Sequence, residues 1–325
     1  MTSPTSRGLT ILFASHNGAR TLPRMIAALE RLDRPARPWR IVAVDNGSTD
    51  ETAAVLKAAA ARLPMTVLDC PTPGKMPSLI HGAREVEGDL VVMTDDDVEP
   101  APGWLTAYER AADARPEFGL FGGPIRPAPL EPLSGWFDVS RRHHAELFAR
   151  TDVGEGDSDP TKFFGPNFML RREHLDLLSA IGAVLGPTFK ASLRHTFPMG
   201  EDTQLMLTAI SRGVRAYGVA AAAVDHLVRS YQTELDFMLQ RAVRHGRGWA
   251  ISYAGVAHPS IRRRLKVLGM GCATALAPAR PESPDRRAFE ALWRAHWLRG
   301  AALGAAFGPF EPRGERRTAR PAEAA

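Results

Sequence analysis

The chain has few cysteines and no long apolar run. Cys70 and Cys272 are its two cysteines in 325 residues, so no disulfide framework is indicated and a reducing compartment is compatible. No stretch reaches the roughly 18 apolar residues that a membrane-spanning helix needs. Residues 1–8 are polar and lack the apolar centre of a secretory signal. We therefore expect a soluble, cytoplasmic protein.

Acidic residues are scarce in the C-terminal part of the chain. From Gln240 to the end there are 16 Arg/Lys against 6 Asp/Glu, whereas the preceding part has 25 against 30. A basic segment of this kind either meets phosphates, anionic lipids or acidic partners, or forms a solvated helix face with a disordered end. The sequence predicts no nucleic-acid partner.

Contact with a membrane is a related expectation for the same part of the chain. Four apolar residues recur at helical spacing within 286–303: Phe289, Leu292, Trp293 and Trp297. Such a face either lies on an anionic membrane or packs into a core. We expect peripheral contact with the inner face of the cell membrane if the first alternative holds.

Strands and helices alternate in the first part of the chain. Apolar periodicity predicts strands over 9–14, 41–44, 65–68 and 90–94, and helices over 21–31, 50–62 and 78–86. This alternation predicts an α/β fold with a Rossmann-like, mostly parallel sheet flanked by helices.

The pattern changes after residue 97. We expect helices over 102–114, 172–178, 201–212, 234–245, 260–279 and 286–306. Residues 118–132 are predicted to cross the sheet edge, 152–161 to form a mobile loop, and 309–325 to be disordered. The chain is thus expected to form one domain over 1–250 and a basic helical extension over 251–325.

Three consecutive aspartates, Asp95, Asp96 and Asp97, follow the apolar residues 90–94. Like charges at the end of a buried strand are unfavourable unless a cation or a proton relieves them. Carboxylate oxygens at the carboxyl edge of a parallel sheet suit Mg²⁺ or Mn²⁺. Asp95 and Asp97 alternate along an extended chain and so face one side, which predicts these two as metal ligands, with contact to a ribose as the alternative for Asp95.

Polar residues also follow two other predicted strands. Asp45, Asn46 and Gly47 lie between a strand and a helix, where Asn-Gly makes a tight turn and later residues cap the helix. Capping does not explain Asp45, whose carboxylate can accept hydrogen bonds from a base or a ribose. The first strand ends in small and polar residues, Ser15 to Gly18, that let a ligand approach the backbone.

Six segments in this order resemble the family 2 glycosyltransferases of the GT-A fold. They are Ser15-His16-Asn17, residues 45–50, Asp95-Asp96-Asp97, residues 165–172, residues 200–205 and Asp225-His226-Leu227. The resemblance implies a nonprocessive, inverting, metal-dependent transfer from a nucleotide-diphosphate sugar, with uridine or guanosine as base. The acceptor would be a hydroxyl of a glycan or a lipid-linked molecule in polysaccharide or glycolipid synthesis.

The resemblance also implies roles for residues on the donor side. Ser15, Asn17 and Asp45 would hold the nucleoside. The aspartates, Asp96 included, would hold Mn²⁺ or Mg²⁺ at the diphosphate. Lys75 either pairs with a phosphate or is a solvated surface lysine, and His226 either ligates the metal or is a core histidine.

On the acceptor side, the resemblance implies Asp202 as general base, taking a proton from the acceptor hydroxyl. Glu201 and Asn167 would lie near the acceptor. The alternative for Glu201 and Asp202 is that acids simply favour a helix N-terminus. Arg241 and Arg244 would neutralise the diphosphate or contact the acceptor, unless they form a charged helix face.

The segment 240–245 also resembles the Q-R-x-x-R-W segment of processive family 2 polymerases. His245 stands where those enzymes have the tryptophan that stacks on the growing glycan. This difference, together with the lack of a membrane-spanning stretch, argues against a processive synthase.

Two other functions remain as alternatives. A sugar-phosphate nucleotidyltransferase would need a glycine-rich, basic triphosphate loop, which residues 14–22 lack. A non-catalytic module for binding a nucleotide sugar or a membrane surface would not need the acids at Asp97 and Asp202.

Overall fold

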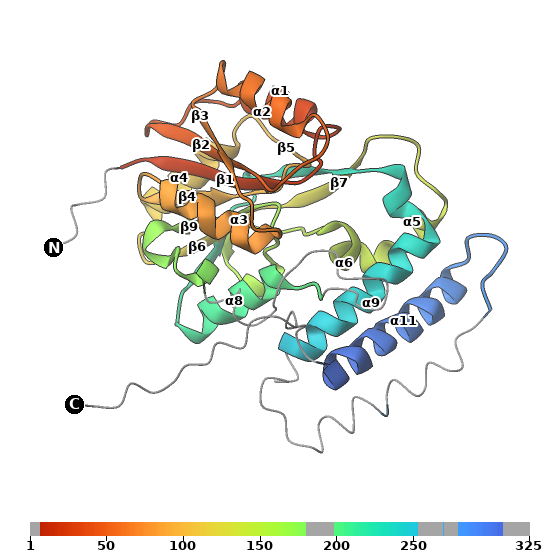
Figure 1. Cartoon of the computed structure of the whole chain (residues 1–325). Coiled ribbons are helices and arrows are strands. Elements are labelled where there is room, and N and C mark those ends of the chain that lie inside the picture. Colours follow the sequence, from red (N-terminus) through yellow and green to blue (C-terminus); the bar gives the residue numbers. More distant parts are fainter. Residues whose placement is uncertain (1–6, 180–197, 253–268, 270–278, 308–325) are drawn as a thin grey trace, which may run out of the picture.

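The structure is a computed structural model that describes residues 7–179, 198–252, 269 and 279–307 (Figure 1). The helix expected over 260–279 lies almost wholly outside the described residues. The disorder expected over 309–325 lies outside them as well.

A large mixed sheet forms the centre of the molecule. In the described part of the chain, eight strands follow the order β3-β2-β1-β4-β9-β6-β10-β8. They are β1 (Leu9–Ser15), β2 (Trp39–Asp45), β3 (Met65–Asp69), β4 (Leu90–Met93), β6 (Leu120–Gly122), β8 (Gly156–Asp157), β9 (Phe168–Arg171) and β10 (Ala216–Gly218). Strands β3, β2, β1 and β4 are mutually parallel, and β9 is antiparallel to both β4 and β6. The expected α/β architecture is confirmed.

Three segments differ from the sequence prediction. Residues 118–132 do not merely cross the sheet edge, because β6 lies inside the sheet between β9 and β10. The predicted loop over 152–161 contains β8, which pairs antiparallel with β10. The helix predicted from residue 172 begins as a 3₁₀ turn, Arg172–His174.

Helices cover both faces of the sheet (Figure 1). Helices α1 (Leu22–Glu30), α2 (Thr52–Ala60) and α4 (Trp104–Ala114) pack on one face, and α3 (Lys75–Gly82) and α8 (Glu201–Ser211) on the other. The side chains of β1 alternate accordingly, with Ile11 and Phe13 in the first core and Leu12 in the second. The short 3₁₀ segments are η1 (Ala83–Glu85), η2 (Arg141–His143), η3 (Pro160–Lys162), η4 (Arg172–His174) and η5 (Ser230–Thr233).

A small second sheet brings His226 to the aspartates. Its order is β5 (Val98–Pro100), β11 (Val224–Val228) and β7 (Ile125–Pro129). Strand β11 is antiparallel to β5, with His226 opposite Val98, the residue that follows Asp97. The amide of Leu227 donates to the carbonyl oxygen of Asp97 at 2.8 Å, which fixes the two segments together.

The C-terminal helix α11 (Arg286–Phe307) packs along α9 (Leu235–Ser252), beside α5 (Trp136–Val139) and α6 (His144–Phe148) (Figure 1). Phe289, Leu292 and Trp293 are at most 5% exposed. Of the two alternatives for this apolar face, the structure has the core, so these aromatics do not support membrane contact. The expected domain boundary at residue 250 falls inside α9. None of the helices within the described residues has the length and apolarity to span a bilayer.

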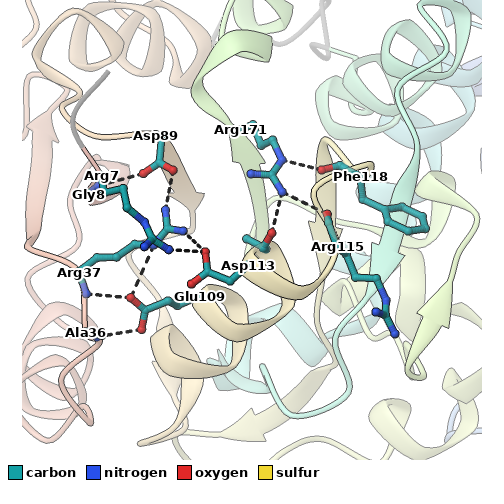
Figure 2. Close-up of polar contacts among 11 residues, drawn as sticks. Arg7, Gly8, Ala36, Arg37, Asp89, Glu109, Asp113, Arg115, Phe118 and Arg171 are labelled. Carbon is teal, nitrogen blue, oxygen red and sulfur yellow. Dashed lines mark hydrogen bonds and ion pairs between the residues drawn. The ribbon is translucent and has the colours of Figure 1, made fainter. Parts of the chain in front are cut away.

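An ion-pair network supports the sheet at the edge away from the aspartates (Figure 2). Arg37 is 7% exposed and contacts Asp89, Glu109 and Asp113. Asp89 also accepts from the amide of Gly8, just before β1. These contacts hold the start of β1 and β4 to α4.

Arg171, in the same view, closes the end of α4. Its guanidinium donates to the carbonyl oxygens of Ala112, Arg115 and Phe118 at 2.8–3.1 Å (Figure 2). These carbonyls lie in and just beyond the last turn of the helix, where backbone oxygens lack helical partners. Arg171 therefore has a structural role.

Candidate active site

The turns after β1 and β2 are joined by hydrogen bonds. Asn17 has φ 54°; its amide donates to Ser48 Oγ at 3.0 Å, and its Oδ1 accepts from the amide of Thr49 at 2.8 Å. Asp45 is 5% exposed, and its Oδ1 accepts from the amide of Ser48 at 3.0 Å. The predicted nucleoside-side residues Asn17 and Asp45 thus lie at one shared turn at the carboxyl edge of the sheet.

The three aspartates have three different partners. Asp95 Oδ1 lies 2.5 Å from Lys75 Nζ, and Asp96 accepts a short hydrogen bond from the Ser15 hydroxyl. Asp97 Oδ1 lies 3.2 Å from His226 Nε2, and its Oδ2 lies 3.7 Å from Arg229 Nη1. Lys75 is therefore paired with a site carboxylate rather than solvated at the surface.

Burial and neighbouring charges shift the pKa values of Asp96, Asp97 and Lys75 in different directions. Burial and the charge of Asp97 raise the pKa of Asp96 to about 7. Burial also raises the pKa of Asp97. The charge and hydrogen bond of His226 and the charge of Arg229 outweigh burial and lower this pKa overall. Burial lowers the pKa of Lys75, and the charges of Asp95 and Asp202 outweigh this and raise it. Lys75 and Asp97 therefore stay charged near neutral pH.

The donor atoms near the aspartates meet the expectation of a metal only in part. Within the described ranges, no three carboxylate, imidazole or thiol groups converge as a ready metal site. Asp97 and His226 do suit a divalent metal as a pair, because the Nδ1 of His226 donates to the carbonyl oxygen of Phe148 at 2.7 Å. This contact leaves Nε2 facing Asp97 as the ligating atom, an arrangement typical of metal-bound histidines.

Asp202 opens helix α8, directly after Gly200 and Glu201. Gly200 has φ 117°, a conformation that favours glycine. The Oδ2 of Asp202 accepts from the amide of Gly165 at 2.8 Å. Burial raises the pKa of Asp202, although the charge of Lys75 opposes the rise. A carboxylate with a raised pKa is suited to accept a proton.

The other acceptor-side residues on α8 and α9 lie around this carboxylate. Glu201 Oε2 accepts from the amide of Gly200 at 3.2 Å. Burial lowers the pKa of Arg241, while the charges of Asp97 and Glu201 raise it in part. Burial and the charge of Arg241 lower the pKa of Arg244 to about 9. Positive charge is thus held close to both the aspartates and Asp202.

Asn167 does not contact the acceptor side, which corrects the prediction. It is 0% exposed, and its Oδ1 accepts from Trp104 Nε1 and the Tyr108 hydroxyl, both at 2.8 Å. Its Nδ2 donates to the carbonyl oxygens of Pro124 and Ala222 at 3.0 and 2.7 Å. All its hydrogen-bonding capacity is used inside the core.

Two site residues were missed by the sequence reasoning. Arg229 lies beside Asp97, and its position directly after the strand of His226 was a signal available in the sequence. Gly165 belongs to the segment 165–172, but the sequence predicted no role for it. A Cβ at this position would lie 2.9 Å from both Asp202 Oδ1 and Lys75 Nζ, so the glycine keeps space where these groups meet.

Known proteins match this chain in part or over most of its length. It is 36% identical over 102 residues to an undecaprenyl-phosphate 4-deoxy-4-formamido-L-arabinose transferase of Sodalis glossinidius; the match spans 29% of this chain and 30% of that relative. The corresponding Edwardsiella ictaluri protein is 33% identical over 95 residues and spans 28% of each chain. The chain thus spans less than a third of the length of these curated relatives.

Solved structures share its fold. A Pyrobaculum calidifontis mannosyltransferase in complex with GDP-Man and Mn²⁺ has a TM-score of 0.53 and 20% identity, covering 94% of this chain and 88% of that one. S. aureus TarS 1-349 in complex with UDP-GlcNAc has a TM-score of 0.51 and 14% identity, covering 93% and 91%. The family model for glycosyl transferase family 2 matches residues 10–177, just over half of the chain. The chain therefore belongs to glycosyl transferase family 2.

Proposed function

We propose that this glycosyltransferase moves a sugar from a nucleotide-diphosphate donor to an acceptor hydroxyl, with inversion and with Asp202 as general base. The observation that carries the proposal is the position of Lys75. It pairs with Asp95 at 2.5 Å, and Gly165 lies against both its Nζ and Asp202 Oδ1. One lysine thus links the aspartates on the donor side to the proposed base. All these residues fall within 1–250, which we infer to be the catalytic domain.

For the donor we infer a UDP- or GDP-sugar, with its nucleoside at the turn of Ser15, Asn17 and Asp45. The mannosyltransferase and TarS structures, in complex with GDP-Man and UDP-GlcNAc respectively, support this kind of donor. Arg229, 3.7 Å from Asp97, and Arg241 add positive charge for the diphosphate. The acceptor is a glycan or a lipid-linked molecule.

For the metal we infer Mn²⁺ or Mg²⁺, which Asp97 and His226 would hold. Mg²⁺ in particular commonly binds one or two carboxylates together with substrate phosphates. The bound ion would supply Lewis-acid stabilisation of the departing diphosphate. Asp95 is already neutralised by Lys75, so we assign it to the donor rather than to the metal shell.

The chain's own groups then account for the transfer. Asp202 takes the proton from the acceptor hydroxyl, and the freed oxygen forms a bond to the anomeric carbon. The bond from that carbon to the diphosphate oxygen breaks with its electron pair, and Arg229 and Arg241 offset the new negative charge. Attack from the face opposite the leaving group inverts the anomeric configuration.

The test is nucleotide release across UDP- and GDP-sugars with Mn²⁺, Mg²⁺ or chelator, for Asp202→Asn and Asp97→Ala. Loss of the base should lower kcat by about 10²–10⁴-fold with donor binding retained. Asp97→Ala should abolish the nucleotide release that Mn²⁺ or Mg²⁺ stimulates. The exposed Asp33→Asn is the matched control. Full turnover by Asp202→Asn would refute the role of Asp202 as base. If the wild-type protein binds the donor but transfers sugar to none of a broad panel of acceptors, a binding module is favoured instead.

A further inference from the structure

A cavity of about 350 Å³ lies beside the segment that carries Asp202. Gly200 and Thr203, on either side of the Glu201–Asp202 pair, line it, and so does Phe164, whose neighbour Gly165 donates to Asp202. Its volume is in the range of pockets that hold small ligands. A molecule in this cavity would therefore lie next to the proposed base.

Helix α9 forms one wall of the cavity with a single face. His245, Gly248, Trp249 and Ser252 are spaced by three, four and seven residues, which places them on one side of a helix. Gly248 is in close contact with the backbone of Met199, so the helix and the segment before α8 meet there. The lining also includes two large aromatic side chains, Trp249 of this helix and Phe164 from the segment before β9.

Among the described residues that line the cavity, some polar side-chain atoms have no hydrogen-bond partner. Glu146 Oε2 and Ser252 Oγ are buried and have no hydrogen-bond partner among the described residues, although Glu146 Oε2 lies 3.9 Å from His143 Nδ1. The Nδ1 of His245 accepts from Trp297 Nε1 at 3.3 Å, which leaves its Nε2–H as a donor. Buried polar atoms without partners cost free energy, which a ligand with several hydroxyls would recover.

The charge of the lining selects among acceptors. In the part of the chain that the structure describes, no arginine or lysine lines the cavity, whereas Glu146 adds a carboxylate. Burial lowers the pKa of His245, so its imidazole is neutral near pH 7. A phosphate would meet the like charge of Glu146 among the lining residues, whereas the nearby Arg241 guanidinium is already directed to the carbonyl oxygen of Glu146 at 3.3 Å.

We propose that this cavity is the acceptor subsite and that it binds a neutral sugar ring, stacked on Trp249 with a hydroxyl directed to Asp202. Glu146, Ser252 and His245 bind the remaining hydroxyls. The proposal rests on the proposed function and names the acceptor class for it. An acceptor whose recognised group is a lipid phosphate is the competing alternative.

The test uses the full chain with its donor and metal. The probes are methyl glycosides of glucose, galactose, mannose and N-acetylglucosamine and, separately, a polyprenyl phosphate in detergent micelles. Glycoside binding is followed by saturation-transfer NMR, and transfer by nucleotide release. Trp249→Ala should lower kcat/KM for the accepted glycoside at least tenfold, chiefly through KM, and Trp249→Phe should restore most of it.

Trp136→Ala is the matched control, because Trp136 packs on Phe289 of α11 and does not line the cavity. It should leave the glycoside KM unchanged. If Trp249→Ala does not fold, Thr203→Val decides, because Thr203 also lines the cavity, and this change should raise the glycoside KM.

Three results would overturn the proposal: no glycoside binding by NMR, transfer to the polyprenyl phosphate alone, or cavity variants that behave like Trp136→Ala. Calorimetric binding of the donor separates this failure from a failure of the proposed function. A chain that binds no UDP- or GDP-sugar overturns both, whereas donor binding without glycoside binding overturns the acceptor subsite alone.

Discussion

At the scale of single residues, the site depends on how closely neighbouring groups approach. Gly165 gives its amide to Asp202 Oδ2 and leaves open the space that a Cβ would fill. The three aspartates are adjacent in sequence but have different partners. Asp95 pairs with Lys75, Asp96 accepts from Ser15, and Asp97 lies against His226. Adjacent carboxylates therefore lie in different surroundings, and burial and the charge of Asp97 raise the pKa of Asp96, whereas His226 and Arg229 lower that of Asp97.

Gly165→Ala should reduce kcat by about 10–100-fold, because the added methyl displaces Asp202 or Lys75 from the reacting groups. The backbone amide is kept, so the change affects position and not hydrogen-bonding capacity. Steady-state kinetics would measure it, with Gly154→Ala as control, since a Cβ there meets nothing within 4 Å. Equal activity of the two variants would show that the space at Gly165 is not used.

Asn167→Leu should destabilise the protein by about 3 kcal/mol, because buried donors and acceptors in the core lose their partner. The groups affected are Trp104 Nε1, the Tyr108 hydroxyl and two carbonyl oxygens. Urea unfolding would measure the change. A raised acceptor KM with unchanged stability would instead restore the acceptor role predicted from the sequence.

At the scale of elements, helices α9 and α11 approach closely enough that glycine is required between them. A Cβ on Gly300 would lie 2.7 Å from the carbonyl carbon of Val243, and one on Gly246 would overlap the backbone at Trp297. This contact also supports the face of α9 that lines the proposed acceptor cavity, through the hydrogen bond from Trp297 to His245.

Gly300→Ala should lower stability by about 1–3 kcal/mol, because the methyl forces the two helices apart. In a free helix the same change would be stabilising by up to about 1 kcal/mol, so the sign itself is the test. Thermal unfolding of full-length variants would report it. An increase in Tm would show that the helices do not pack as described.

At the scale of the whole molecule, the chemistry and the main ion-pair network lie at opposite ends of the strands. The aspartates follow β4, whereas Asp89 precedes it and binds Arg37 together with the amide of Gly8 (Figure 2). Stability and catalysis can therefore be altered separately at these two edges.

Arg37→Met should cost on the order of 3 kcal/mol, since it leaves partly buried carboxylates without their cation. Arg7→Met, at an exposed pair, should change stability by less than about 1 kcal/mol. Burial raises the pKa of Asp89, but the Gly8 amide and Arg37 lower it overall. Its contribution is therefore present above pH ~4 and lost as the pH falls further, a loss that should shrink in Arg37→Met. Denaturant unfolding at several pH values measures both effects, and an unchanged kcat in folded Arg37→Met is expected.

The predictions from sequence were most successful where a local pattern suffices. The strands and helices before residue 97 follow from apolar periodicity, and the family resemblance from the ordered motifs is confirmed by the match over residues 10–177. Short strands such as β8 and β10 were missed, because two or three residues carry too little periodicity. Asn167 was misplaced because its motif says nothing about burial.

The sequence alone determined the α/β alternation and the carboxylates at the strand ends, because strand period and turn chemistry are local properties. Only the tertiary structure decided which partner each aspartate has, that Arg229 and His226 meet Asp97, and that the aromatic face of α11 lies in a core. These facts depend on contacts between segments distant in the chain. No local pattern encodes such contacts, since they arise from the packing of the whole molecule.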